Sequence, residues 1–562
     1  MLNNFRLFIL FLFSLFFAEV YSQNLELKII GNDSLETQVI DSLGYENYFK
    51  DYTSLKTEVD SLNKRLLTIG YINSKLVHLK KESDSLFKAL FSLNQRYKSI
   101  TINHNGLIDE DILTLGDIKS NGQSFTLPIS KLERTLNFIN AEIANRGNPF
   151  STLQLINIKQ VSNTSLSANL ELSKPFKRTI DKIIIKGYEK FPKSFVKRYM
   201  KIKTGQEFNL AKIKDKTAEL NDLRFANQIK DPEVLFTKDS TILYMYIEKT
   251  KSNTFDGFLG FGTNEDTNKI EFDGYLNLSL TNNLNYGETL KLLYKSDEND
   301  QQTFDGNIKM PYMFSTPLGV ELNLNIFKKD STFVTASQSA KLNYQVNSNH
   351  VIGVGLSGVN SSDLLDTEIS SVNDFKSNYY FTNYVYTKRQ NYDFLFPINF
   401  IFDITAGFGN RTFDDIDEDQ TKFALNTFKI FNLNDQNSFY LRGNGQIIDS
   451  DTFLENELPR FGGINSIRGF EENSLVANLF GVINTEYRYR LNRNIYVHSV
   501  IDAAYFENKI SDQKGKLFGF GFGFGLLSKA GLLRFNYTSG KTENQRFKLS
   551  NSKVHISLTA VF

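Results

Sequence analysis

The stretch Phe518-Gly519-Phe520-Gly521-Phe522-Gly523-Phe524-Gly525 alternates a large aromatic side chain with glycine throughout its length. Successive side chains on a β-strand point to opposite faces, so one face of this strand carries only phenylalanine and the other only glycine. A phenylalanine row suits contact with lipid, whereas a glycine row leaves room where a bulky group must approach the backbone. The stretch therefore predicts a strand with an apolar outer face and a crowded inner face.

Similar segments continue on both sides of this stretch. From about residue 253 to residue 562, strand-length segments of alternating polarity recur between turns rich in Asn, Asp, Gly and Ser, and about sixteen can be counted. A strand that crosses a membrane needs ~9–11 residues, and such alternation is typical of an outer-membrane barrel. A soluble β-sandwich alternates too, but it does not normally continue for so many strands. We therefore expect residues 253–562 to form an all-β, antiparallel transmembrane barrel.

The same alternation places acidic side chains on the inner face of the barrel. Glu486, on the segment 478–491, and Asp502, on the segment 495–506, both fall on the face opposite the aliphatic and aromatic residues. Arg468 lies in the glycine-containing loop that precedes both segments. A buried arginine needs a carboxylate, because breaking a buried ion pair costs about 3–5 kcal/mol. We expect Arg468 to reach into the lumen and to pair with Glu486, Asp502 or both.

The residues before the barrel follow a different pattern. Between residues 24 and 252, helix-like and strand-like segments alternate in the order strand, helix, helix, strand, strand, with a period of roughly 75 residues. In the clearest unit, the predicted strands are 179–187, 225–236 and 240–249, and the predicted helices are 193–200 and 209–223. The pattern predicts three α+β modules, covering residues 23–95, 96–175 and 176–252.

The N-terminus is typical of a secretory signal. The apolar run Leu7 to Phe17 follows Arg6, and Val20-Tyr21-Ser22 offers small residues at a suitable spacing for cleavage after Ser22. Residues 1–22 are therefore the predicted signal peptide. An N-terminal membrane anchor is the alternative, although the run is shorter than the ~20 residues that a spanning helix needs.

The composition excludes several kinds of chemistry. Cysteine is absent, so disulfides, thiolate nucleophiles and cysteine metal sites are excluded. The 64 basic and 63 acidic residues nearly cancel, which gives no reason to expect a nucleic-acid partner. His498 lies near Asp502, but no serine in a matching context follows. We expect no catalytic residues, no metal site and no cofactor.

These residues resemble the BamA/TamA-type outer-membrane assembly family over essentially the whole chain after the signal. Ile467-Arg468-Gly469-Phe470, preceded by Gly463, resembles the Arg-Gly-Phe/Tyr motif of the sixth extracellular loop in that family. Ile501-Asp502-Ala503-Ala504 resembles its Phe-x-Asp-x-Gly strand motif, with Ala504 where the family usually has glycine, and Glu486 matches an acidic position on the preceding strand. The terminal Phe562 resembles the family's outer-membrane recognition signal.

The three predicted modules resemble the periplasmic POTRA domains of the same family. The matching details are the strand and glycine of Ile185-Lys186-Gly187, the turn Gly205-Gln206-Glu207-Phe208, and the helix end Asn145-Arg146-Gly147-Asn148-Pro149-Phe150. The resemblance implies an outer-membrane location, with the N-terminal modules in the periplasm.

The resemblance also implies a function that is not enzymatic, namely the insertion of other barrel proteins into the outer membrane or the passage of substrates across it. The expected opening is the seam between the first strand, about residues 255–263, and the last strand, which carries Val554, Ile556, Leu558 and Phe562. A weakly paired seam exposes strand edges that can template an incoming strand. Cysteines near Leu259 and Leu558 are expected to cross-link it.

The implied partners are unfolded outer-membrane or exported proteins and the lipid bilayer, with periplasmic chaperones or lipoproteins as further candidates. Two other functions stay open. One is a dedicated two-partner-type secretion translocator, and the other is a passive outer-membrane pore. Conductance without any effect on barrel assembly would favour the pore.

Overall fold

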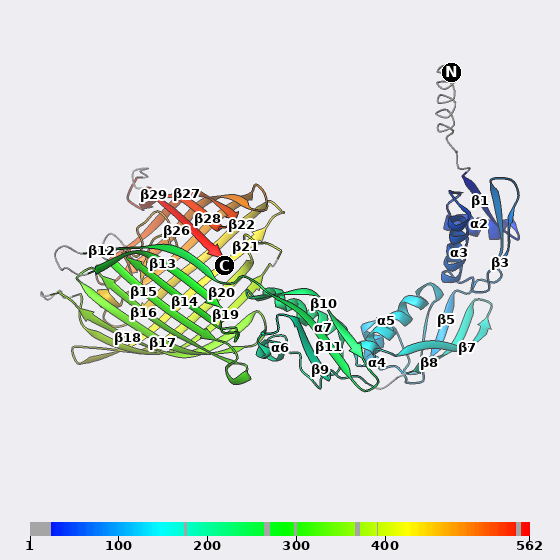
Figure 1. Ribbon diagram of the computed structural model, residues 1–562, viewed down its shortest axis with the longest axis horizontal. Helices are drawn as coiled ribbons and strands as arrows, with labels where there is room; N and C mark the ends of the chain where they lie inside the picture. The colour runs from blue at the N-terminus through cyan, green and yellow to red at the C-terminus, as the bar shows by residue number, and fades with distance from the viewer. Residues whose placement is uncertain are drawn as a thin grey trace, which may run out of the picture. The chain divides into compact units, whose positions relative to one another are not determined.

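The computed structural model describes residues 24–173, 177–263, 270–296, 301–365, 371–390, 392–546 and 552–561 (Figure 1). The predicted signal segment 1–22 and the predicted recognition residue Phe562 lie outside the described residues. The chain divides into two compact units. The first extends to Thr179 and includes Glu207–Asn209, and the second comprises Ile180–Gln206 and Leu210–Phe562. No helix of the described chain is long and apolar enough to span a membrane.

The first unit holds two sheets, each covered by helices. The first sheet has the strand order β2-β1-β4-β3. Its elements are β1 Leu25–Gly31, α2 Ser34–Leu43, β2 Tyr48–Phe49, α3 Tyr52–Thr68, β3 Lys75–Lys81 and β4 Leu86–Ser92. The apolar stripe of α3 packs on this sheet, with Leu55, Leu62 and Leu66 fully buried. The Asp51 carboxylate caps the helix by accepting a 2.8 Å hydrogen bond from the Ser54 amide.

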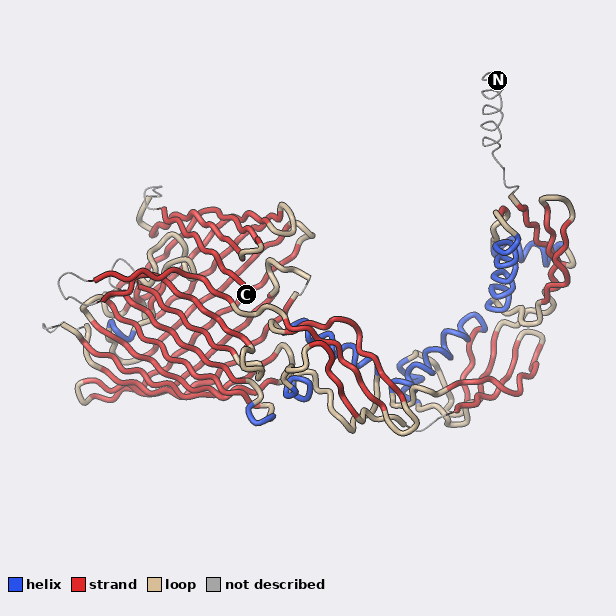
Figure 2. Tube along the Cα trace, in the orientation of Figure 1, coloured by secondary structure: helices blue, strands red, loops and turns tan. Residues whose placement is uncertain are grey.

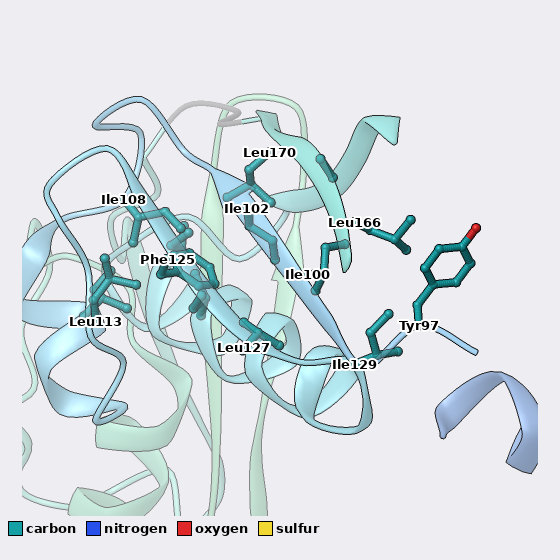
Figure 3. Close-up of a cluster of buried hydrophobic side chains, with 14 residues drawn as sticks. Tyr97, Ile100, Ile102, Ile108, Leu113, Phe125, Leu127, Ile129, Leu166 and Leu170 are labelled. Atoms are coloured by element: carbon teal, nitrogen blue, oxygen red, sulfur yellow. The ribbon is translucent and has the colours of Figure 1, made fainter. Parts of the chain in front are cut away.

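The second sheet has the order β6-β5-β8-β7 and its own apolar core (Figure 3). Its elements are β5 Ser99–Asn103, α4 Glu110–Leu115, β6 Ser124–Pro128, η1 Ile129–Lys131, α5 Leu132–Asn145, β7 Thr152–Ser162 and β8 Ser165–Ser173. Ile100, Phe125 and Leu166 come from three different strands and meet in this core. The strand β6 was not expected, because its five residues end on a proline and carry only a short alternation.

The second unit begins with a three-stranded sheet of order β10-β11-β9. Its elements are β9 Lys182–Gly187, α6 Lys193–Arg198, α7 Leu210–Ala218, η2 Glu219–Asp222, β10 Ala226–Phe236 and β11 Thr241–Lys249. The strand β9 begins at Lys182, three residues later than expected, because Thr179 forms an isolated bridge with Glu207 instead. The predicted second helix ends at Ala218 and continues as a 3₁₀ turn that buries Leu220.

Sixteen strands of the described chain then close into an antiparallel barrel, which confirms the predicted fold class (Figure 2). They are β12 Thr254–Thr263, β13 Ile270–Thr281, β14 Thr289–Ser296, β15 Gln301–Met310, β16 Leu318–Lys329, β17 Phe333–Gln345, β18 His350–Asp363, β19 Phe375–Arg389, β20 Ile398–Phe413, β21 Ile416–Asn432, β22 Asn437–Asp449, β25 Leu479–Arg490, β26 Ile495–Asn508, β27 Gln513–Ser528, β28 Gly531–Thr542 and β29 Ser552–Val561. On β27, the side chains of Phe520, Phe522 and Phe524 are exposed on the outer wall, and the alternating glycines face the lumen.

The seam of the barrel is its least extensively paired strand contact. Among the described residues, β12 pairs with β29 only at Thr254–Val561 and Phe255–Ala560. By contrast, β12 pairs with its other neighbour β13 along its whole length. One side-chain contact adds to the seam, because the Asp256 carboxylate accepts a hydrogen bond from Thr559. Within the described ranges, most of the β29 edge therefore has no backbone partner on β12.

The last α+β module rests against the periplasmic turns of the barrel. The Tyr188 hydroxyl donates a 2.6 Å hydrogen bond to Asn285 and accepts one of 2.9 Å from Asn282, both in the turn after β13. Burial raises the pKa of Tyr188 above its ordinary value. The Phe195 ring packs edge-on against Tyr312, with centroids 4.9 Å apart. A mixture of polar and aromatic contacts thus fastens this module to the barrel.

Candidate functional site

The candidate site is built around the long segment 450–478 between β22 and β25, called loop six below. It contains η4 Glu455–Glu457 and a small hairpin of β23 Arg460–Phe461 and β24 Leu475–Val476. An apolar cluster fixes it against β25, β26 and β27. The rings of Phe461 and Phe480 stack with centroids 4.5 Å apart, and Ile467 is completely buried. This packing holds the residues after Ile467 inside the lumen.

Arg468 is buried and forms several hydrogen bonds with the two predicted acids, Glu486 and Asp502. Its Nε and Nη2 atoms donate hydrogen bonds of 2.8 and 2.7 Å to the two carboxylate oxygens of Asp502, and its backbone amide donates a third of 3.0 Å. Its Nη1 atom donates to Glu486. The Asp502 carboxylate is thus held in a fork, which is the strong geometry for a guanidinium–carboxylate pair. The three residues Arg468, Glu486 and Asp502 are called the lumen lock below.

A second arginine balances the charge of the lumen lock. Arg488 donates a 2.7 Å hydrogen bond from Nε to the other oxygen of Glu486. Its guanidinium also lies over the ring of Tyr440, 4.1 Å from the centroid. Two cations therefore face two carboxylates, so neither acid is left buried without a partner. Alternation along β25 placed Arg488 on the lumen face, but its share in the lock could be seen only in three dimensions.

The glycines of β27 and β28 create the space for loop six. A Cβ atom at Gly519 would lie 2.3 Å from the Arg468 carbonyl oxygen, and a Cβ at Gly540 would lie 2.5 Å from the Gly469 carbonyl oxygen. Both distances are far below van der Waals contact. The backbone of the Arg468–Gly469 pair consequently touches the barrel wall directly, which explains the glycines at positions 519 and 540; Gly523 and Gly525 instead leave room for the His498 and Tyr496 rings.

The remaining predicted loop residues surround the lumen lock. Gly463 has a φ of +91° and Gly469 a φ of +92°, a conformation that residues with a Cβ rarely adopt. The Phe470 ring lies beside Gly540 and packs on the apolar cluster. Ala504, where the resembled family has glycine, is buried in the same cluster, so its methyl group is accommodated by packing on loop six.

The predicted seam residues lie apart from the lumen lock. Val554, Ile556 and Leu558 are exposed on the outer wall of β29, whereas Arg468 is buried in the lumen. The structure thus does not bring the two sets of residues into one site. The lumen lock and the seam are separate features of the same barrel. Loop six contacts both, because Glu471 near its end contacts Lys553 on the seam strand β29.

A second buried ion pair, which the sequence did not predict, anchors the first half of loop six. Arg411 on β20 is completely buried and contacts Glu457 of η4, and its Nη2 atom also contacts Glu418 on β21 at 2.6 Å. Asn456 donates hydrogen bonds of 2.9 Å to the Ser361 hydroxyl and 2.8 Å to the Asn373 carbonyl. Polarity alternation places Arg411 on the lumen face, but nothing local to Glu457 indicates that η4 reaches it.

These clusters of ion pairs and hydrogen bonds anchor loop six to the barrel wall. In the part of the chain that the structure describes, no group of three or more His, Asp or Glu side chains is placed to hold a metal ion. His498, the histidine nearest the lock, is hydrogen-bonded at 2.9 Å to Asn536. The arrangement can hold loop six in the lumen and can be released by breaking ion pairs.

Comparison with known proteins supports this architecture. A family model described as POTRA, surface antigen variable number repeat, matches residues 178–250, within the segment predicted as the third module. The outer membrane protein assembly factor BamA of Nitratidesulfovibrio vulgaris is 26% identical over 262 residues, which are 42% of this chain and 32% of that protein. The match thus covers about a third of this relative's length.

Solved structures share the fold at low sequence identity. BamA from Haemophilus ducreyi, lacking its POTRA domains 1–3, aligns with a TM-score of 0.51 at 15% identity, covering 84% of this chain and all of that one. CdiB from Escherichia coli aligns with a TM-score of 0.53 at 13% identity, covering 91% of this chain and 97% of that one. CdiB from Acinetobacter baumannii gives 0.52 at 16% identity, covering 83% and 90%. The chain is therefore an outer-membrane protein with the fold shared by BamA and CdiB, in which a periplasmic N-terminal POTRA region precedes a C-terminal barrel of sixteen strands.

Proposed function

We propose that this protein inserts client β-barrel proteins into the outer membrane by templating their strands at its seam. The observation that carries the proposal is that, in the described part of the chain, β12 pairs with β29 at two residue positions only. A strand edge with unpaired N–H and C=O groups binds another strand readily, because each new ladder bond satisfies two exposed polar groups. The seam is the place in this barrel where such an edge is almost free.

The lumen lock supports this function by keeping the barrel intact while its seam opens. Arg468 holds loop six on β25 and β26, through Glu486 and Asp502, and not on the seam strands. The seam can therefore separate without unpacking the apolar cluster around Ile467. Loop six also fills lumen space that an unobstructed passive pore would need, which disfavours the pore.

The similarity to an assembly factor, and the absence of any expected catalytic residue, favour a role that is not enzymatic. The proposed partners are unfolded outer-membrane or exported proteins, presented at the sheet edges of the POTRA modules, together with the lipid bilayer. Periplasmic chaperones or lipoproteins are further candidate partners. No cofactor is proposed, because the folding of the client can supply the free energy.

The test is to lock the seam. Continuing the observed register from Phe255–Ala560 brings Leu259 opposite Ile556, two residues from the Leu558 position expected from the sequence. Leu259→Cys with Ile556→Cys should cross-link on oxidation, and the chain contributes no native cysteine to interfere. Client insertion into liposomes should stop in the oxidised protein and return on reduction.

The matched control places cysteines on neighbours that the client would not separate. Phe408 and Thr421 are directly paired on β20 and β21, far in sequence from the seam. Oxidised Phe408→Cys with Thr421→Cys should insert clients at the uncross-linked rate. Full client assembly by the seam-locked protein would instead contradict lateral insertion and favour the alternative, a dedicated secretion translocator that passes its substrate through the lumen.

A further inference from the structure

Two acids in loop six, shortly after Arg468, reach strands on the two sides of the seam. Glu471 contacts Lys553 on β29, with 2.8 Å between Oε1 and Nζ. Glu472 approaches Lys295 on β14, with 4.0 Å between Oε2 and Nζ. β29 is one seam strand, and β14 lies two strands beyond the other seam strand, β12. Adjacent residues of one loop therefore join opposite flanks of the seam.

Both lysines project toward the lumen near the extracellular ends of their strands. Lys553 is the second residue of β29, and Lys295 is the second-last residue of β14. Both therefore lie next to the turns at the end of the barrel away from the periplasm. The two ladder pairs of the seam, Thr254–Val561 and Phe255–Ala560, lie at the opposite, periplasmic end. Loop six thus makes ionic contacts at the end of the seam where backbone pairing is missing.

The lysines lie close enough to influence a common neighbour. His555, on the lumen face of β29, interacts electrostatically with both Lys295 and Lys553. Two cations facing each other across a weak seam repel, and two carboxylates between them reverse the sign of that interaction. The approach of Glu472 to Lys295 on β14 places this acid on the β12 side of the seam.

The backbone of loop six is shaped to deliver these acids. A Cβ atom at Gly463 would lie 2.1 Å from the Glu472 carboxylate oxygen and 3.0 Å from its Cα atom. Glycine at position 463 thus leaves room for Glu472 to point at β14. On the other side, Gly469 packs on Gly540, and only Gly469 and Phe470 separate Arg468 of the lumen lock from Glu471.

We propose that Glu471 and Glu472, with Lys553 and Lys295, form an ionic clip that holds the extracellular end of the seam closed, and that loop six couples this clip to the lumen lock. The four residues are called the seam clip below. This inference rests on the proposed function, because it assigns a regulatory contact to the same opening. Exposed ion pairs are individually weak. They can still matter here, because the described residues of β12 and β29 form only two backbone pairs.

The test measures the width of the seam in the full chain reconstituted in lipid vesicles. Spin labels on Leu292→Cys in β14 and Ile556→Cys in β29 report the distance across the seam by pulsed electron paramagnetic resonance. Neighbouring strands lie ~4.8 Å apart, so opening by one strand width should lengthen the distance by on the order of 5 Å. Glu471→Lys with Glu472→Lys should add a longer population that is small in the native chain.

Charge reversal of the partners separates the seam clip from general damage. Adding Lys295→Glu and Lys553→Glu to the double variant restores opposite charges, so the native distance should return. The control variant Lys516→Glu removes a comparably exposed pair with Glu543 that does not cross the seam, and it should leave the distance unchanged. Raising the salt from 0.1 to 1 M shortens the Debye length from ~10 to ~3 Å and should widen the native seam partway.

An unchanged distance in the double variant, or a charge swap that fails to restore it, would overturn the seam clip. Client insertion is scored separately, on the Leu259→Cys, Ile556→Cys protein without spin labels. If the seam widens as expected but the Leu259–Ile556 cross-link leaves client insertion unchanged, the seam clip is supported and the proposed function is contradicted. If the cross-link blocks insertion but the clip variants leave the seam unchanged, the proposed function stands and the clip fails.

Discussion

At the residue scale, Arg468 makes the most extensive buried contact: three hydrogen bonds from its side chain and one from its backbone amide end on two buried carboxylates. Arg468→Ala should leave Asp502 and part of Glu486 without a cation, which costs about 3–5 kcal/mol where the site is dry. Hydrogen exchange of residues 461–470 should then accelerate strongly. Arg493→Ala, in an exposed turn, is the control and should leave exchange unchanged. Unaltered protection of loop six in Arg468→Ala would contradict the role of the lock.

The second buried arginine makes a separate prediction. Arg411→Met removes the partner of both Glu457 and Glu418, so we expect residues 450–461 to leave the barrel mouth and single-channel conductance to rise. Lys329→Met removes a more exposed pair with Glu455, of the kind worth about 0–1 kcal/mol, and should change conductance little. Equal conductance in the two variants would show that the Arg411 contact does not hold residues 450–461 in the barrel.

At the scale of the elements, the strands β27 and β28 fix how closely the backbone of loop six can approach the barrel wall. Gly519→Ala on β27 would push a methyl group to within 2.3 Å of the Arg468 carbonyl oxygen. Overpacking of this kind costs roughly 1–3 kcal/mol, and here it should also displace the lumen lock. The temperature at which the barrel loses its fast gel mobility should fall.

A glycine with open space around it is the matched control for this element. Gly481 lies on β25, and nothing lies within 4 Å of a Cβ built there. Gly481→Ala should keep the native transition temperature. If Gly519→Ala is equally silent, loop six does not rest on the β27 wall as the structure has it.

At the scale of the whole molecule, the junction between the last module and the barrel decides how this POTRA sheet faces the periplasmic turns. A Cβ at Gly287, which has a φ of +78°, would lie 2.1 Å from the Phe195 ring. Gly287→Ala should therefore loosen the junction, and spin labels on Lys193 and Asn347 should show a broader distance distribution. Gly205→Ala carries similar backbone strain, at φ +80°, but has no neighbour within 4 Å, and it should leave the distribution narrow. Equal broadening in both variants would assign the effect to strain alone.

The sequence by itself determined the class of fold and the face of each barrel strand. Alternation is a local property, because a strand turns successive side chains to opposite sides whatever lies beyond it. The Phe/Gly row of β27 and the inward positions of Glu486 and Asp502 follow from it directly. The same reasoning shows why the approximate strand number could be counted, since each strand carries its own polarity pattern between turns.

Only the tertiary structure decided which side chains meet and where the barrel is weak. Arg411 and Glu457 are 46 positions apart, and Glu471 reaches Lys553 over 82 positions. Such contacts depend on how loop six returns through the lumen, which no local pattern encodes. The register of β12 against β29 is equally non-local, because the chain does not connect these strands through a turn. The two-pair seam and the seam clip, on which the proposed function and its regulation rest, could therefore be found only after the barrel had closed.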